Sequence, residues 1–316
     1  MLVWIRRIVV YGLLLLILAA AAGLVWLRQD AHRPLESYWV DRHGTLDGFE
    51  FGASQRSATQ SNDFITLTSD SGLEVSARVI RPRVHEQPLP VLMVLGGHRT
   101  GSDAVDLFGE VGQNAIIALD YPYHGPERVK GLVPVLETIP LARQGFLDTV
   151  PAVSLVIDWL TEQSWVDTDR IVVIGASLGV PFASTAAVRD ERIDAVVLVH
   201  GAADNRLWLE WQVRRRVDIE FLHYPLGTIL HWLAYGPALN TGQHVAKLSP
   251  RPVVIIGARH DERTPPGETE RLFAAASEPK LLRWTEGSHV DPDRPEVIGE
   301  LMAIAAEVLP LVGAAE

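Results

Sequence analysis

RIVVIGASLGVPF at residues 170–182 is the stretch that decides the fold. Its β-branched run at 171–174 predicts a short buried strand, and the residues from Val180 onward favour a helix. Between them lies Gly175-Ala176-Ser177-Leu178-Gly179, a G-x-S-x-G pattern in a strand–turn–helix context. The two glycines allow the sharp turn, which presents the Ser177 hydroxyl at its tip. The pattern predicts a nucleophilic serine, with an ordinary tight strand-to-helix turn as the alternative.

A serine nucleophile requires a general base, and the base requires a group that orients it. Both residue types follow Ser177 in the chain. Asp261 lies in the loop after the apolar strand expected at 252–257, and His289 lies in the loop after the next expected strand. Asp204, one strand earlier, is the alternative acid. The sequence therefore predicts a Ser–His–Asp triad of Ser177, His289 and Asp261.

The chain resembles the α/β-hydrolase family over about residues 64–309. The segments that carry the resemblance are VLMVLGGHRTGSD at 91–103, AIIALDYPYHGPE at 115–127, IVVIGASLG at 171–179, VVIIGARHDERTPP at 253–266 and TEGSHVD at 285–291. In that family the nucleophile, the acid and the base follow one another in the order that Ser177, Asp261 and His289 have here. The resemblance implies serine-dependent hydrolysis without a cofactor.

The resemblance also implies an oxyanion hole made of two backbone N–H groups. One donor would be Leu178, directly after the nucleophile. The other would follow the Gly96-Gly97 pair, which is similar to the family's His-Gly-x loop with its first His replaced by Gly. This places the second donor at His98, with Gly97 as the alternative.

Composition narrows the function further. The 316 residues suit one large domain with appendages, and the absence of cysteine excludes disulfides, thiolate chemistry and cysteine-based metal sites. A net charge of −11 argues against a nucleic-acid partner. We find no H-E-x-x-H and no similar metal-ligand spacing, so we expect no metal. Nothing in the sequence indicates the oligomeric state.

The N-terminus contains an uncharged apolar run at 8–27, long enough as a helix to cross a bilayer. We interpret residues 1–28 as a membrane anchor. Arg6 and Arg7 precede the run, which favours an extracytoplasmic hydrolase domain. The alternative is a signal peptide cleaved near Ala19–Ala22, which would leave a secreted or periplasmic protein.

The rest of the chain divides into a linker at 29–62, with a short strand expected near Gly48–Gly52, and a hydrolase domain at 63–316. Short apolar runs alternate with helical stretches in the domain, which predicts a doubly wound, mostly parallel sheet. An aromatic-rich insertion at about 203–248 breaks this alternation, and we expect it to form a helical cap over the site. Two other roles stay open for the insertion: additional packing on the flank, or bilayer contact through Arg214–Arg216.

Together these features predict a membrane-anchored serine hydrolase that acts on a small-molecule ester or acyl substrate, most readily a carboxylic ester. A serine peptidase or a thioesterase of the same fold is the alternative within enzymes. A non-catalytic binding protein with this fold fits less well, because all three triad residues are present in the required order.

Overall fold

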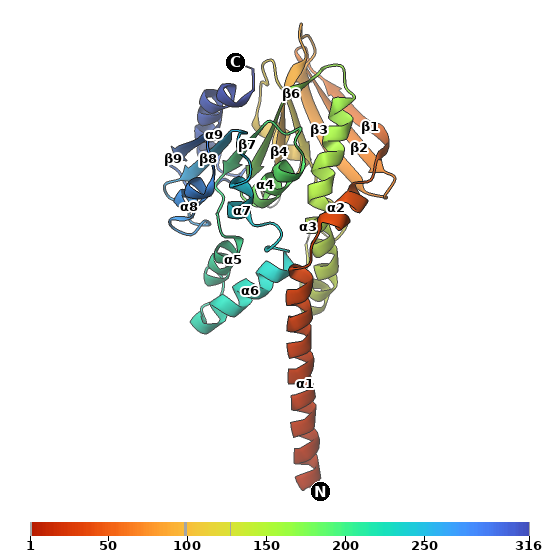
Figure 1. Ribbon diagram of the computed structural model, residues 1–316, viewed down its shortest axis with the longest axis vertical. Coiled ribbons are helices and arrows are strands. Elements are labelled where there is room, and N and C mark those ends of the chain that lie inside the picture. The colour runs from red at the N-terminus through yellow and green to blue at the C-terminus, as the bar shows by residue number, and fades with distance from the viewer. Residues whose placement is uncertain (1, 98–99, 127, 316) are drawn as a thin grey trace.

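The computed structural model describes residues 2–97, 100–126 and 128–315, and a long helix projects from its α/β body (Figure 1). Within these residues a nine-stranded sheet has the order β1-β2-β3-β5-β4-β6-β7-β8-β9. The first four in this order pair antiparallel, and β5, β4, β6, β7, β8 and β9 run parallel. The strands are β1 (Leu46–Arg56), β2 (Gln60–Ser69), β3 (Glu74–Pro82), β4 (Leu89–Leu95), β5 (Ala115–Leu119), β6 (Val166–Ala176), β7 (Ala195–Val199), β8 (Val253–Ala258) and β9 (Lys280–Thr285).

Helices cover both faces of the sheet, so the central strands are buried runs of Val, Ile and Leu. One face packs against α2 (Glu36–His43), α3 (Leu132–Thr161), α4 (Gly179–Arg189) and α8 (Glu268–Ala275). The other face packs against the 3-10 helix η1 (Ser102–Leu107) and α9 (Pro295–Val308). A final 3-10 turn, η3 (Pro310–Val312), follows α9. The expected doubly wound architecture brings the carboxyl ends of β6, β7, β8 and β9 to one edge.

Residues 29–62 have more regular structure than the expected linker. They contain α2, and the short strand expected near Gly48–Gly52 is part of the longer β1, which extends the sheet by pairing with β2. Tertiary contacts explain this structure, because Trp39 is buried against α3, where its indole N–H donates to the Leu147 carbonyl. Helix α3 begins at Leu132 and continues through Pro140 and Pro151.

The insertion between β7 and β8 contains α5 (Asn205–Arg214), the 3-10 turn η2 (Glu220–Leu222), α6 (His223–Leu233) and α7 (Thr241–Val245). In Figure 1, α5 and α6 lie at the end of the body from which the N-terminal helix projects. Helix α1 (Leu2–Ala31) contacts α6. The insertion and the N-terminal helix are therefore neighbours in space.

Most of α1 is surrounded by solvent. Within the described residues, Trp4–Ala31 is the one helix that is long and apolar enough to cross a membrane, and a signal sequence would share these properties. Its exposure ends near its C-terminus, where Leu27 and Ala31 are buried against the body. The last turn of α1 is thus part of the folded domain.

Candidate active site

Ser177 occupies a sharp turn between β6 and α4. Its φ of 52° lies in the left-handed region, as expected for a strained nucleophile turn. The flanking glycines are sterically required, because a Cβ on Gly179 would lie 2.1 Å from the Leu95 carbonyl oxygen and one on Gly175 would lie 2.7 Å from Ala183 Cβ. The Ser177 N–H donates to the Val199 carbonyl at 2.9 Å, which ties the turn to β7. The close fit of the two glycines and one backbone hydrogen bond therefore hold this turn in place.

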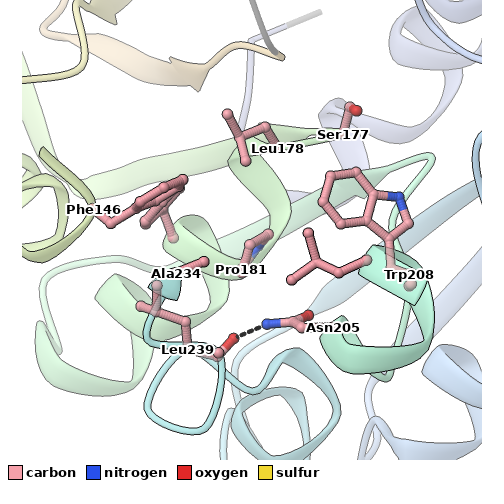
Figure 2. Close-up of a pocket in the computed structure, with 12 residues that line it drawn as sticks. Phe146, Ser177, Leu178, Pro181, Asn205, Trp208, Ala234 and Leu239 are labelled. Atoms are coloured by element: carbon pink, nitrogen blue, oxygen red, sulfur yellow. Dashed lines mark hydrogen bonds between the residues drawn. The ribbon is translucent and has the colours of Figure 1, made fainter. Parts of the chain in front are cut away.

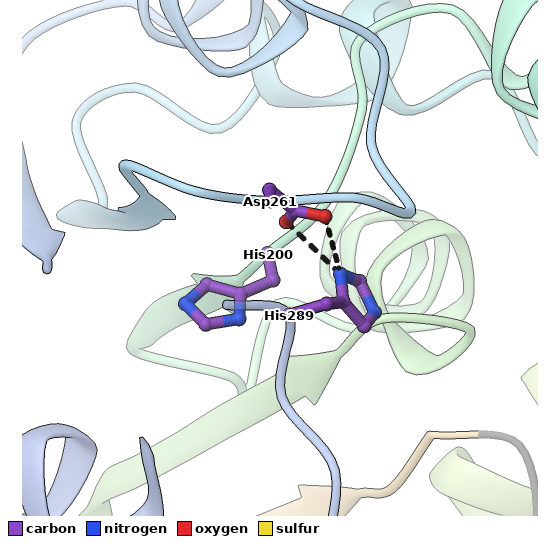
Figure 3. Close-up of side chains that lie close together, drawn as sticks. All are labelled: His200, Asp261 and His289. Atoms are coloured by element: carbon purple, nitrogen blue, oxygen red, sulfur yellow. Dashed lines mark hydrogen bonds and ion pairs between the residues drawn. The ribbon is translucent and has the colours of Figure 1, made fainter. Parts of the chain in front are cut away.

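Asp261 and His289 come from the loops after β8 and β9, and Figure 3 shows their side chains facing each other. His289 Nδ1 lies 2.9 Å from each carboxylate oxygen of Asp261. His289 Nε2 lies 2.7 Å from Ser177 Oγ, and the His289 side chain is fully buried. The three residues expected to form a triad therefore form one continuous chain of hydrogen bonds.

The Asp261 carboxylate is held in its charged form. Its Oδ1 accepts hydrogen bonds from the backbone N–H groups of Arg263 (2.8 Å) and Thr264 (2.7 Å). Burial raises the pKa of Asp261, but the hydrogen bond and charge of His289 and the Thr264 N–H outweigh it and keep the pKa below its usual value. An ionised Asp261 can orient the His289 ring and stabilise its cation.

Side chains that sequence reasoning missed hold the backbone of the His289 loop. Glu262 Oε2 accepts from the His289 N–H at 3.0 Å, and the Arg294 guanidinium donates to the His289 carbonyl at 3.2 Å. Glu262 and Arg294 also form an ion pair at 2.9 Å. No motif marks either residue, although Glu262 directly follows the expected acid.

His200 is the third missed residue. It lies just beyond β7 with a φ of 52° and is fully buried, its ring centroid 5.6 Å from that of His289. Its Nδ1 accepts from the Val290 N–H at 2.8 Å, and its Nε2 lies 3.2 Å from Thr285 Oγ1. Burial, followed by the nearby His289, lowers the pKa of His200 to about 4. Neutral His200 is thus the acceptor that fixes the backbone next to His289.

His200, Asp261 and His289 are close enough to resemble a metal-binding cluster, since their ligating atoms lie within 4.8 Å of one another. However, the Nδ1 atom of each histidine that faces this cluster already has a hydrogen-bond partner, Val290 N–H or Asp261. These hydrogen bonds account for the close approach of the three side chains.

The oxyanion side of the site is described in part. Leu178 is the N-cap residue of α4, a position whose N–H has no acceptor within the helix. His98, the other expected donor, lies outside the described residues. Gly97, the alternative, is close to the nucleophile, because a Cβ on Gly97 would lie 3.5 Å from Ser177 Cβ. The loop is anchored by Tyr121, whose hydroxyl donates to the Gly96 carbonyl at 2.5 Å.

An apolar cavity of about 60 Å³ extends from Ser177 beneath the inserted helices (Figure 2). Phe146 of α3 and Trp208 of α5 line it, and Ala234, Gly236 and Leu239 contribute from the segment after α6. A second cavity of about 70 Å³ lies on the other side of Ser177. It is lined by the Gly96-Gly97 loop and by polar residues that include Arg263 and Asp291. Ser177 therefore lines both an apolar and a more polar space.

Asp204, the alternative acid, lies elsewhere. Its Oδ1 accepts from the N–H groups of Arg206 (2.8 Å) and Leu207 (3.1 Å), so it caps the N-terminus of α5. The structure does not bring it to His289, whose Nδ1 faces Asp261.

Comparison with known proteins gives one match to a family and several similar folds. Residues 148–284 match the model of the prolyl oligopeptidase family, a stretch that includes Ser177 and Asp261 and ends before His289. An uncharacterized protein, YfhR, of Salmonella typhimurium is 27% identical over 158 residues, which are 48% of this chain and 49% of that protein. The match thus spans about half the length of this curated relative.

Solved structures are similar over most of the chain. An acetyl xylan esterase from Thermoanaerobacterium sp. JW/SL YS485 has a TM-score of 0.61 at 16% identity, covering 92% of this chain and 98% of that one. An acetyl xylan esterase from Paenibacillus sp. R4 has a TM-score of 0.58 at 18% identity, covering 87% of this chain and 98% of that one. A cold-adapted esterase from an Arctic intertidal metagenomic library has a TM-score of 0.54 at 17% identity, covering 81% and 97%.

Proposed function

Because the chain has the α/β-hydrolase fold, we propose that it is a membrane-anchored serine hydrolase that cleaves carboxylic esters. The observation that carries this proposal is the hydrogen-bonded chain from Ser177 Oγ through His289 to Asp261. A hydroxyl, an imidazole and a carboxylate in this order are the parts that acyl transfer to serine requires.

In the proposed reaction, Ser177 Oγ attacks the acyl carbon while His289 Nε2 accepts the hydroxyl proton. Asp261 keeps the Nδ1 proton of His289 in place and stabilises the imidazolium. The N–H groups of Leu178 and of His98 or Gly97 would donate to the oxyanion. His289 then returns the proton to the leaving alcohol, and a water molecule activated by His289 hydrolyses the acyl-enzyme to the acid.

The two cavities support assignments for the two halves of the ester. The apolar cavity beside Trp208 would hold the acyl chain, and its volume of about 60 Å³ fits a short one. The cavity beside Arg263 and Asp291 would hold the more polar alcohol part. A series of p-nitrophenyl esters should therefore show the highest kcat/KM for short acyl chains, and Trp208→Ala should shift the preference toward longer ones.

The test of the nucleophile is Ser177→Ala. This variant should lose both ester hydrolysis and labelling by a fluorophosphonate, while its thermal unfolding stays close to that of the unchanged protein. Ser184→Ala is the matched control, because Ser184 lies buried in α4, the helix that follows Ser177, where its hydroxyl donates to the Pro181 carbonyl at 3.1 Å. Labelling that survives in Ser177→Ala would disprove the assignment.

The match to the prolyl oligopeptidase family favours a second candidate, a serine peptidase. The same triad would attack an amide, with His289 protonating the leaving amine. Peptide p-nitroanilides assayed beside the esters distinguish the two. Turnover of the anilides without turnover of any ester would replace esterase by peptidase.

The anchor is proposed on the exposed apolar helix α1. We expect full-length protein to remain with membranes after alkaline extraction, with the hydrolase domain on the extracytoplasmic side. Because the chain has no cysteine, Val84→Cys provides a unique label on the domain for a membrane-impermeant maleimide applied to intact cells. Recovery of protein that starts after Ala22 would indicate a cleaved signal peptide instead.

A further inference from the structure

The exposed apolar side chains of the domain are concentrated near α1. Outside α1, most of the large hydrophobic residues that are exposed in the described part of the chain lie in two segments. These are the first half of α3 and the segment from Ile219 to Leu230, which includes η2 and most of α6; the exposed residues are Val133, Val135, Leu136, Leu141, Ile219, Phe221, Tyr224 and Leu230. We call these eight residues the apolar rim. A monomeric soluble protein rarely leaves such a concentration uncovered.

The apolar rim has a fixed position relative to α1. Asp30, in the last turn of α1, forms an ion pair with Arg143 of α3 and accepts a hydrogen bond from the Tyr235 hydroxyl at 3.0 Å. Arg143 also donates to the Trp232 and Leu233 carbonyls, at 3.2 and 3.1 Å, where α6 ends. One junction therefore joins α1, α3 and α6.

Both segments of the apolar rim extend beyond this junction. In Figure 1 the first half of α3 and the beginning of α6 reach past the point where α1 leaves the body, in the direction of the α1 N-terminus. The uncovered apolar surface of α1 starts at the same level, just before Leu27. A bilayer crossed by α1 up to Leu27 would therefore meet both segments at its surface.

Charged residues border the apolar rim. Exposed Arg128 and Lys130 precede the first half of α3, and exposed Arg214–Arg216 precede η2. Among the residues that the structure describes here, three exposed acids, Glu137, Asp218 and Glu220, lie near these five cations. Basic residues next to Phe, Tyr and Leu are the pattern of surfaces that insert into a lipid headgroup region.

We propose that the apolar rim docks into the headgroup region of the same bilayer that α1 crosses. The proposal rests on α1 being a membrane anchor, and it adds a second membrane contact made by the catalytic domain itself. The cavity beside Ser177 is lined from α3, α5 and the segment after α6, the elements that carry or adjoin the apolar rim. Docking would thus bring the acyl-binding side of the site to the lipid surface.

The test uses the full-length chain with single cysteines, each unique because the chain has none of its own. Leu136→Cys and Phe221→Cys place an environment-sensitive fluorophore on the two segments of the apolar rim. Val84→Cys is the matched control, because Val84 is an apolar residue with 81% exposure in the turn between β3 and β4, beside the other end of α3. Leu14→Cys, in the middle of α1, reports on the anchor.

Each labelled protein is reconstituted into vesicles of phosphatidylcholine and phosphatidylglycerol that contain a nitroxide-labelled lipid. We expect quenching at positions 136 and 221 to be at least about twofold stronger than at position 84, because only groups in the bilayer meet the quencher. We also expect weaker quenching at position 221 in vesicles of phosphatidylcholine alone, because anionic lipid attracts Arg214–Arg216.

Strong quenching at position 14 with control-level quenching at 136 and 221 would reject docking and leave the anchor in place. Absence of quenching at position 14 would reject the anchor and the docking with it. A blue-shifted but unquenched label at 221 would show that protein, such as a second copy of the chain, covers the apolar rim, which also overturns the proposal.

Discussion

The turn that carries Ser177 and the loop that carries His289 follow strands of the same sheet, but different interactions hold them. The Ser177 turn is determined locally by two glycines that fit against Leu95 and Ala183. The His289 loop is held by Arg294 from within the loop and by Glu262 and His200 from two other segments. Ser177 is thus positioned by backbone shape, whereas His289 is positioned by a polar network.

The largest effect should come from separating the base from its acid. Asp261→Asn keeps the size of the side chain but removes the charge that fixes the Nδ1 proton of His289. We expect kcat for ester hydrolysis to fall about 10⁴-fold with an unchanged Tm. A decrease below about tenfold would mean that another carboxylate orients His289.

A second substitution tests the steric contribution of the glycines to the Ser177 turn. Gly179→Ala would place a Cβ 2.1 Å from the Leu95 carbonyl oxygen, a backbone atom that cannot move aside. We expect a loss of about 3 kcal/mol in the free energy of unfolding, measured by urea titration. Gly299→Ala in α9, where a Cβ meets nothing within 4 Å, should be neutral or stabilising. Equal stability of both variants would contradict the steric explanation.

A third substitution tests the network around His289. Glu262→Ala removes the acceptor of the His289 N–H and the partner of Arg294, so the imidazole loses its alignment with Ser177. We expect a decrease of about 10²-fold in kcat with little change in KM. Glu262→Gln keeps an acceptor and should recover part of this loss. Glu286→Ala, which removes an exposed acid from the His289 loop, is the control. If Glu262→Ala lowered the free energy of unfolding but left kcat unchanged, Glu262 would stabilise the fold without positioning His289.

The smallest effect concerns His200 and pH. Its pKa is about 4 in the folded chain against 6.5 ordinarily, so between these values the unfolded chain binds a proton that the folded chain excludes. Stability should therefore fall as the pH drops from about 6.5 to about 4, with His200 contributing up to about 1.4 kcal/mol per pH unit. His200→Gln should show a shallower slope in urea titrations over this range. An unchanged slope would mean that His200 becomes protonated while folded.

These differences explain how much could be predicted from the sequence. The α/β-hydrolase fold is confirmed, because alternating buried strands and the pattern around Ser177 are local properties of the chain. The roles of Ser177, Asp261 and His289 stay predictions, although the structure brings the three together. The contacts of Glu262 and His200 with the His289 loop could not be predicted, because they depend on which strands become neighbours. Arg294 lies in the loop itself, but no local pattern marks its contact with the His289 carbonyl.

The organisation before the domain was harder to predict for the same reason. The polar stretch at 29–62 has little periodicity, yet Trp39 and β1 gain their structure from α3 and β2. The first half of α3 is apolar without being part of the core. Neither burial by a distant partner nor exposure of an apolar helix can be recognised from local pattern.

The junction of Asp30, Arg143 and Tyr235 limits how the enzyme can search for substrate. The last turn of α1 is buried and α2 begins at Glu36, so only a short connection joins α1 to the domain. If α1 is the membrane anchor proposed above, the domain would move laterally and rotate about α1 at a fixed height above the bilayer, unlike a domain on a flexible linker. Ser177 would then remain at one distance from the bilayer surface. Esters that diffuse at the same depth would encounter it by two-dimensional rather than three-dimensional diffusion.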